Sequence, residues 1–182
     1  DNMKPNRIAI IGGGASGTAV AISILRKNAA KELFLIDKTN PFHRGVAYGT
    51  KYLEHLLNVP AKKMSVIKEE PEHFFNWVQK NNISNEGNTF IPRLLYGKYL
   101  EDTYTEVRDN SDVKIYQVIS EVIGIRTQNG KYIVKSEKEE IEVDKVILTS
   151  GWQTGMGVPH EIPASLDYNA KAIIIGTGLT AI

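Results

Sequence analysis

The strongest constraint on the fold is a run of glycines that stands between an apolar strand and a helical segment. Residues 7–11 read RIAII, and residues 12–17 read GGGASG. Residues 18–30 then carry alanine, valine, isoleucine and leucine on one helical face, and residues 32–37, ELFLID, form a second apolar strand. A strand, a glycine turn, a helix and a strand in this order predict a βαβ unit with two parallel strands.

The spacing of the glycines indicates what this turn could bind. Gly12 permits a tight turn, Gly14 lets the backbone approach a pyrophosphate without a Cβ, and Gly17 lets the helix pack closely on the strand. The amides at the helix N-terminus would then face the phosphates. Asp37 ends the second strand, where a carboxylate can accept hydrogen bonds from both hydroxyls of an adenosine ribose and repels a 2′-phosphate. The pattern predicts a site for FAD or NAD; the alternative is a glycine turn that serves helix–strand packing alone.

The middle of the chain is expected to be helical. Residues 70–81 place Pro71 in a first helical turn and carry the aromatic cluster Phe74, Phe75 and Trp77, which we assign to the core. Residues 93–107 repeat leucine and tyrosine at helical spacing. Residues 39–50 are rich in Pro, Gly and His and are expected to form a loop.

The pattern changes after these helices to short runs of alternating apolar and polar residues. Asn129-Gly130 is a strong hairpin signal, so we expect a small antiparallel β-meander. Residues 145–148, KVIL, return to the pattern of a buried parallel strand and lead into Thr149-Ser150-Gly151. The fold class is therefore α/β, with a central parallel sheet, helices and a meander. The alternating runs are residues 113–116, 118–128, 132–136 and 140–143.

Composition narrows the range of functions. The net charge is +1, from 22 basic and 21 acidic residues, which indicates no nucleic-acid partner. The chain has no cysteine, and its four histidines lack metal-ligand spacing, so we expect no thiol chemistry and no metal site. No apolar run approaches the roughly 20 residues that span a bilayer. We expect a cytoplasmic protein that acts on a small-molecule substrate, without a membrane partner and with its oligomeric state left open.

Three longer strings support a family assignment. HRGVAYGT (43–50), HLLNVPAKKMSV (55–66) and FIPRLLYGKYL (90–100) recur together, in this order, in a family of bacterial FAD/NAD(P)-binding proteins. The chain resembles the N-terminal region of that family over nearly its whole length. Its helices and meander resemble the FAD domain of glutathione-reductase-like flavoproteins, which bind two dinucleotides. The resemblance implies a Rossmann-like FAD-binding domain, built as a three-layer ββα sandwich.

The family is similar to flavin N-monooxygenases that use NADPH and oxygen. The resemblance therefore implies an FAD-dependent oxidoreductase or monooxygenase with NADPH or NADH as the reductant, and it identifies no catalytic residue. A non-catalytic FAD- or NAD-binding module or sensor is the alternative. A plain NAD-dependent dehydrogenase fits less well, because a nicotinamide-binding domain usually continues as βαβαβ without a meander.

The resemblance also implies roles for individual residues. Arg44 could instead be a solvated loop charge, and Asn58 could bond loop backbone instead of the cofactor. Trp152 is the first aromatic to test for contact with the flavin. The expected cofactor-binding residues are Gly12, Gly14, Ala15, Ser16 and Gly17 at the pyrophosphate; Asp37 and Lys38 at the adenosine; Arg44, Gly45 and Val46 along the phosphate and ribitol; Asn58 to Met64 toward the flavin ring; Val118, opening a meander strand, at the adenine; and Ser150, Gly151 and Trp152 at the closing turn.

A second glycine motif stands at the end of the sequence. Residues 171–175, KAIII, lead into a G-x-G-x-x-A pattern formed by Gly176, Gly178 and Ala181, which resembles the start of an NAD(P)H domain. Alanine in the third position favours NADP. We expect an FAD-binding domain at 7–152, a linker at 153–169 and the beginning of an NAD(P)-binding domain at 170–182. This organisation predicts an N-terminal fragment that is inactive alone; the alternative is a short protein whose last strand joins its own sheet.

Overall fold

A computed structural model describes residues 5–39 and 42–151 of the chain. The predictions made for Trp152, for the linker at 153–169 and for the motif of Gly176, Gly178 and Ala181 lie outside these residues.

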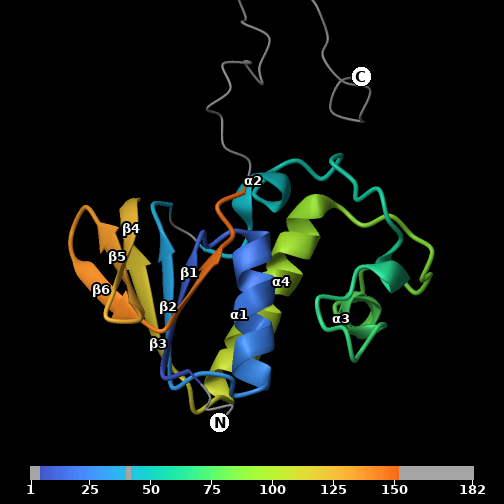
Figure 1. Ribbon diagram of the computed structural model, residues 1–182. Helices are drawn as coiled ribbons and strands as arrows, with labels where there is room; N and C mark the ends of the chain where they lie inside the picture. The colour runs from blue at the N-terminus through green and yellow to red at the C-terminus, as the bar shows by residue number, and fades with distance from the viewer. Residues whose placement is uncertain (1–4, 40–41, 152–182) are drawn as a thin grey trace, which may run out of the picture. The chain divides into compact units, whose positions relative to one another are not determined.

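The described part is built around a four-stranded sheet in which every neighbouring pair of strands is parallel (Figure 1). The two central strands are buried on both faces, with Ile8, Ala9 and Ile10 at most 4% exposed. Burial on both faces explains why these strands read as continuous apolar runs without alternation. In spatial order the strands are β3 (Lys114–Ile119), β2 (Glu32–Asp37), β1 (Arg7–Ile11) and β7 (Lys145–Leu148).

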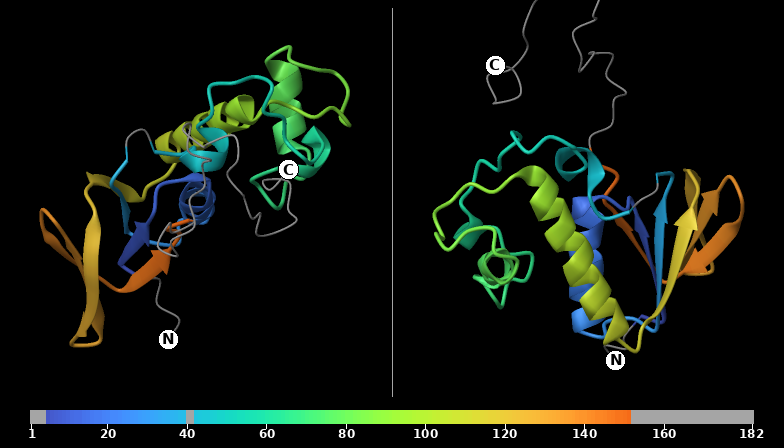
Figure 2. Two further views of the ribbon diagram at one scale, coloured as in Figure 1. Left: turned by 90° about the horizontal axis from the view of Figure 1, so that it is seen from above. Right: turned by 180° about the vertical axis from the view of Figure 1, so that it is seen from behind.

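Two long helices cover one face of this sheet. α1 (Ala15–Arg26) and α4 (Arg93–Asp109) lie side by side, as the two views of Figure 2 show. Ile22 and Leu25 of α1 and Tyr104 of α4 belong to one buried cluster with apolar residues of β1 and β2. The helices therefore bury the side of the sheet that carries Ile10, Leu33 and Leu35.

A small antiparallel sheet covers the other face. Its order is β4-β5-β6, and its buried residues pack against the opposite side of β1 and β2. Antiparallel sheet, parallel sheet and helices thus form three layers, which confirms the predicted α/β class. Asn129 and Gly130 both have positive φ angles, 51° and 76°, as a tight hairpin turn requires. The strands are β4 (Val122–Gln128), β5 (Lys131–Ser136) and β6 (Glu140–Val143).

The prediction was wrong about where the meander begins. β3 pairs with β2 in parallel register from Glu32 opposite Lys114 to Asp37 opposite Ile119. Val118 therefore opens no meander strand; it lies within the parallel sheet, opposite Ile36. The alternating pattern led to the wrong prediction because β3 is an edge strand that is partly exposed to solvent. Its sequence therefore resembles that of an antiparallel strand with one solvent-exposed face.

Helix boundaries also differ from the prediction. α1 begins at Ala15, because the glycine turn passes directly into the helix. α3 (His73–Lys80) begins after Pro71, so this proline is not in its first turn. The expected loop at 39–50 contains the short helix α2 (Gly45–Tyr48), and a 3-10 helix, η1 (Ala61–Lys63), follows.

The assignment of the aromatic cluster to the core is confirmed. Phe74 is fully buried, Phe75 is 7% exposed, and Trp77 packs against the same apolar cluster. This cluster joins α3 to Tyr96, Tyr99 and Leu100 of α4. It forms a second core, separate from the one beneath α1.

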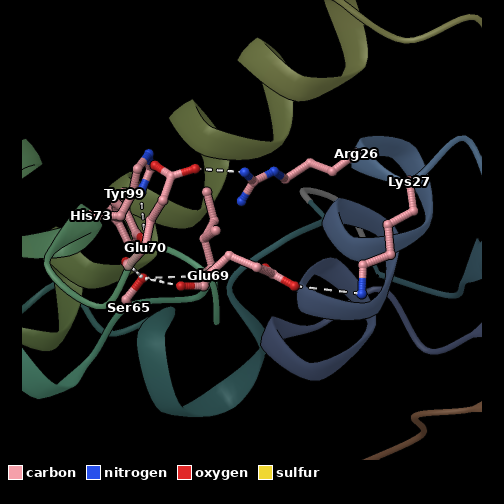
Figure 3. A network of polar contacts seen from close by, with 8 residues as sticks. Arg26, Lys27, Ser65, Glu69, Glu70, His73 and Tyr99 are labelled. Atoms are coloured by element: carbon pink, nitrogen blue, oxygen red, sulfur yellow. Dashed lines mark hydrogen bonds and ion pairs between the residues drawn. The ribbon is translucent and has the colours of Figure 1, made fainter.

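A polar network ties the segment before α3 to both long helices (Figure 3). The backbone amide of Val66 donates to the Tyr99 hydroxyl over 3.1 Å, and the same hydroxyl lies 2.9 Å from His73 Nδ1. Two ion pairs at the C-terminal end of α1 complete the network, Arg26 with Glu70 at 2.5 Å and Lys27 with Glu69 at 3.6 Å. The glycine turn lies at the other end of α1.

We predict that Gly17 tolerates no side chain. An ideal Cβ at Gly17 would lie 1.9 Å from the backbone oxygen of Gly12, so Gly17→Ala must displace main chain. The free energy of unfolding should fall by about 1–3 kcal/mol, measured by urea denaturation. Gly124→Ala is the matched control, because nothing lies within 4 Å of its ideal Cβ; its effect should stay within about 0.5 kcal/mol. Equal losses in both variants would contradict the packing argument.

Candidate functional site

The glycine turn lies where three strand ends meet. The Gly12 amide donates to the Ile36 carbonyl at 2.8 Å, which links the ends of β1 and β2. Thr149, directly after β7, donates through its hydroxyl to the carbonyls of Ile11 (3.1 Å) and Gly12 (2.8 Å). Gly12 has a φ of 105°, and an ideal Cβ there would lie 2.2 Å from the Thr149 carbonyl oxygen. Parallel α/β sheets bind ligands at this edge, outside the carboxyl ends of their strands.

The N-terminus of α1 faces this edge without a side-chain cap. Gly14 occupies the N-cap position and gives no side-chain hydrogen bond, and the first turn contains no acidic residue. The first amides of a helix have no intrahelical acceptor, and they carry the positive end of the helix dipole. Ser16, in the first turn, is exposed. This end of α1 is therefore suited to an anion.

Asp37 directs its carboxylate at the glycine turn. One oxygen, Oδ2, accepts a hydrogen bond from the Gly13 amide at 2.5 Å. The other, Oδ1, accepts from the amide and the hydroxyl of Thr39, both at 2.7 Å. An ionised carboxylate offers about four acceptor positions, so these three bonds leave one open. Thr39 was missed by the sequence reasoning, although an Asp followed two residues later by Thr is a recognisable turn signal.

His43 fixes the chain that follows β2 against the glycine turn. Its amide donates to the Gly13 carbonyl at 2.6 Å, and its Nδ1 lies 3.2 Å from the Thr18 hydroxyl on α1. The imidazole also packs on the Tyr104 ring, 4.3 Å between centroids. Burial lowers the pKa of His43 to about 4, against the opposing charge of Glu101. His43 is therefore neutral at pH 7. No spacing pattern in the sequence indicated that His43 holds this segment against the glycine turn.

The three residues predicted to follow the phosphates take different positions. Arg44 forms a two-pronged ion pair with Glu101 of α4, with Nε to Oε1 at 2.7 Å and Nη2 to Oε2 at 2.8 Å. These hydrogen bonds raise the pKa of Arg44 and lower the pKa of Glu101. Gly45 lies over the turn, its Cα 3.3 Å from an ideal Cβ at Gly14. Val46 is fully exposed.

The remaining predicted residues are spread around this edge. Lys38 is exposed and pairs with Glu121 at 3.0 Å. The Ser120 amide donates to the Asp37 carbonyl at 3.0 Å, which places the end of β3, and with it Val118, beside the end of β2. Ser150 and Gly151 are exposed after β7.

The residues expected near a flavin ring lie on the segment that leads to α3. Asn58 is exposed, so its amide is not a buried group that requires a partner. Met64 packs against the same apolar cluster as Ala15 of α1. The structure thus brings the glycine turn, Asp37 and Gly45 together, and it links Met64 to them through the core.

Two other kinds of site find no support in the described residues. Within 5–39 and 42–151, histidine, aspartate and glutamate side chains form no group of three that could hold a metal ion. No helix in the same ranges has the length and apolar character needed to cross a membrane.

Comparison with known proteins places the chain among dinucleotide-binding proteins. A sequence profile described as FAD-NAD(P)-binding matches residues 9–153. No curated protein matches significantly. Among solved structures, the bacillithiol disulfide reductase Bdr of Staphylococcus aureus is 21% identical with a TM-score of 0.52, covering 82% of this chain and 39% of that one.

Two further solved structures have the same fold. Thioredoxin reductase of Lactococcus lactis is 15% identical, with a TM-score of 0.50 over 85% of this chain and 38% of that one. FqzB is 15% identical, with a TM-score of 0.53 over 80% of this chain and 36% of that one. At these identities the likeness concerns the fold, and the chain spans less than two fifths of each of the three proteins.

We predict that His43 makes stability depend on pH. Burial lowers the pKa of His43 from 6.5 in the unfolded chain to about 4 in the folded protein, so the unfolded state binds more protons between these values. The contribution of His43 to the free energy of unfolding should therefore fall as the pH falls from about 6.5 to about 4, and stay level above that window. His43→Asn should flatten this decline in urea denaturation, because asparagine does not titrate and tolerates the positive φ of 92°.

The exposed His55 provides the control. His55→Asn should keep the pH dependence of the wild type. The explanation fails if His43→Asn loses stability between pH 6.5 and 4 as steeply as the wild type does.

Proposed function

The chain belongs to the FAD-NAD(P)-binding family, and from this premise we propose that it forms the FAD-binding part of a flavin-dependent NAD(P)H oxidoreductase. One observation carries the proposal: an acidic side chain at the end of β2 is bonded to the backbone of an uncapped glycine turn. That arrangement places amide donors for a pyrophosphate next to a carboxylate that can accept hydrogen bonds from a ribose. A single hydrogen bond, from the Gly13 amide to Asp37, connects the two parts.

The glycine turn fits a diphosphate. The amides at the start of α1 are donors, and Gly14, at the N-cap position, places no side chain on them. Gly45, the nearest neighbour of Gly14 across the turn, also lacks a side chain. Backbone amides and the helix dipole would thus hold the phosphates, and no cationic side chain is required for this.

Asp37 fits a ribose that carries no 2′-phosphate. Its carboxylate has one open acceptor position, and rotation of the Thr39 hydroxyl would release a second. Two ribose hydroxyls could then donate to it. A 2′-phosphate would meet this negative charge at short range, which favours FAD or NAD over NADP at this turn.

The antiparallel layer favours FAD over NAD. β4, β5 and β6 stand between the third and the fourth strand of the parallel sheet in the sequence, where a nicotinamide-binding domain would continue with a helix. This order resembles the FAD domain of glutathione-reductase-like flavoproteins.

A bound flavin would supply hydride and one-electron chemistry, and the residues of this chain would bind, orient and shield it. NADPH or NADH would be the reductant, and a monooxygenase is the form of the activity that we favour, since the family resemblance is to flavin N-monooxygenases.

We predict that the purified protein holds FAD and that Asp37 contributes to its affinity. Asp37→Ala should raise the Kd for FAD at least about tenfold, because hydrogen bonds to a charged acceptor are worth about 1.5–3 kcal/mol. Flavin fluorescence titration measures this effect. Asp112→Ala removes the same charge at an exposed position next to the opposite end of β3, and it should leave the Kd unchanged.

Colour separates the oxidoreductase from a simple binding module. A yellow protein whose visible absorption bleaches with NADPH or NADH supports the oxidoreductase. A colourless protein that binds NAD supports the module. A protein with affinity for neither dinucleotide contradicts the proposal altogether.

A further inference from the structure

We infer that Arg44 is a positioning residue, whose ion pair with Glu101 holds the cover segment, residues 42–48, over the glycine turn. The inference deepens the proposed function and rests on it, because the effect of the pair on a ligand presumes that a dinucleotide binds at this turn. It differs from the role that the family resemblance implies, in which Arg44 follows the phosphate and ribitol directly.

The ion pair between Arg44 and Glu101 has a geometry that restricts the orientation of both side chains. Two parallel bonds, 2.7 and 2.8 Å, connect the guanidinium fork of Arg44 to both carboxylate oxygens of Glu101. Such a two-pronged contact fixes orientation as well as distance. Both side chains are about three-quarters buried, at 25% and 23% exposure, so water competes less for the pair than at an open surface.

The surface of α4 is shaped to receive the cover segment. Gly97 lies on α4 one turn before Glu101. An ideal Cβ at Gly97 would lie 2.6 Å from the Tyr48 carbonyl oxygen and 3.2 Å from the Cγ and Cδ of Arg44. Any side chain at this position would push the segment away from the helix. Gly97 and Glu101 therefore act together, one by clearing space and the other by pairing.

The opposite side of the cover segment rests on the glycine turn. His43 bonds the Gly13 carbonyl through its amide, and Gly45 stands directly over Gly14. His43 and Gly45 both have positive φ, 92° and 61°. A non-glycine residue in this region costs roughly 1–3 kcal/mol and persists only where its surroundings hold it. The pair with Glu101 supplies such a restraint one residue away.

The two possible roles of Arg44, positioning the cover segment and contacting phosphate directly, predict opposite effects for the loss of Glu101. If Arg44 acts through the cover segment, loss of Glu101 is equivalent to loss of Arg44. If Arg44 contacts phosphate itself, loss of Glu101 frees the guanidinium and leaves binding intact or strengthens it. Glu101 is therefore the residue that separates the two roles.

The test measures FAD affinity in a double-mutant cycle, by flavin fluorescence on the full chain. Arg44→Gln and Glu101→Gln should each raise the Kd about tenfold, and the double variant should be no weaker than either single one, because the two residues act as a unit. The charge-swapped variant, Arg44→Glu with Glu101→Arg, should recover most of the lost affinity. Lys98→Gln is the control, since it breaks an exposed ion pair with Asp102 on the same helix and should leave the Kd unchanged.

A second measurement follows the cover segment itself in the absence of FAD. Amide hydrogen exchange in residues 43–48 should rise in Arg44→Gln and Glu101→Gln and stay at the wild-type level in Lys98→Gln. This readout also keeps the inference separate from the proposed function: a wild-type protein that binds no FAD defeats the proposed function, and the exchange data then decide whether the pair holds the segment.

Two results would overturn the inference. One is wild-type FAD affinity in Glu101→Gln together with weakened binding in Arg44→Gln, which would assign Arg44 to the phosphates. The other is unchanged exchange in residues 43–48 in both variants, which would show that the pair does not hold the segment.

Discussion

The structure depends on how closely β1, α1 and the end of β7 approach one another at the glycine turn. The backbone oxygen of Gly12 stands where a side chain at Gly17 would begin, and the Thr149 carbonyl stands where one at Gly12 would begin. Hydrogen bonds from Thr149 to Ile11 and Gly12 close this contact. Because backbone meets backbone here, the helix starts directly at the strand end and directs its first amides at the edge where ligands bind.

The same contact organises the polar side chains around it. Asp37 reaches the turn through the Gly13 amide, and His43 reaches it through the Gly13 carbonyl. Gly13 has no room for a side chain, since an ideal Cβ would lie 2.1 Å from the Phe42 ring. One residue thus links the acid that would bind a ribose to the segment that covers the turn. The site is formed mainly by backbone groups, and its side chains mostly hold that backbone in place.

A good part of the fold could be predicted because it rests on neighbours in the sequence. The strands β1, β2 and β7 were predicted from their apolar runs, and the hairpin was predicted from Asn129-Gly130. The assignment of β3 was wrong because an edge strand of a parallel sheet alternates like a meander strand. Asp37 lies beside the turn as its offset suggested. Thr39 was missed although its turn with Asp37 is local, whereas His43 was missed because its contact with Thr18 forms only on folding.

The sequence by itself determined the βαβ unit and the place of the glycine turn, since positive φ, tight packing and apolar periodicity are properties of short segments. Only the tertiary structure decided that Arg44 pairs with Glu101, 57 residues further along the chain, and that Gly97 makes room for that approach. A charge pair between distant segments leaves no periodic trace in a sequence. Its partners meet because the segment that contains α2 packs on α4, and these two segments lie far apart in the sequence.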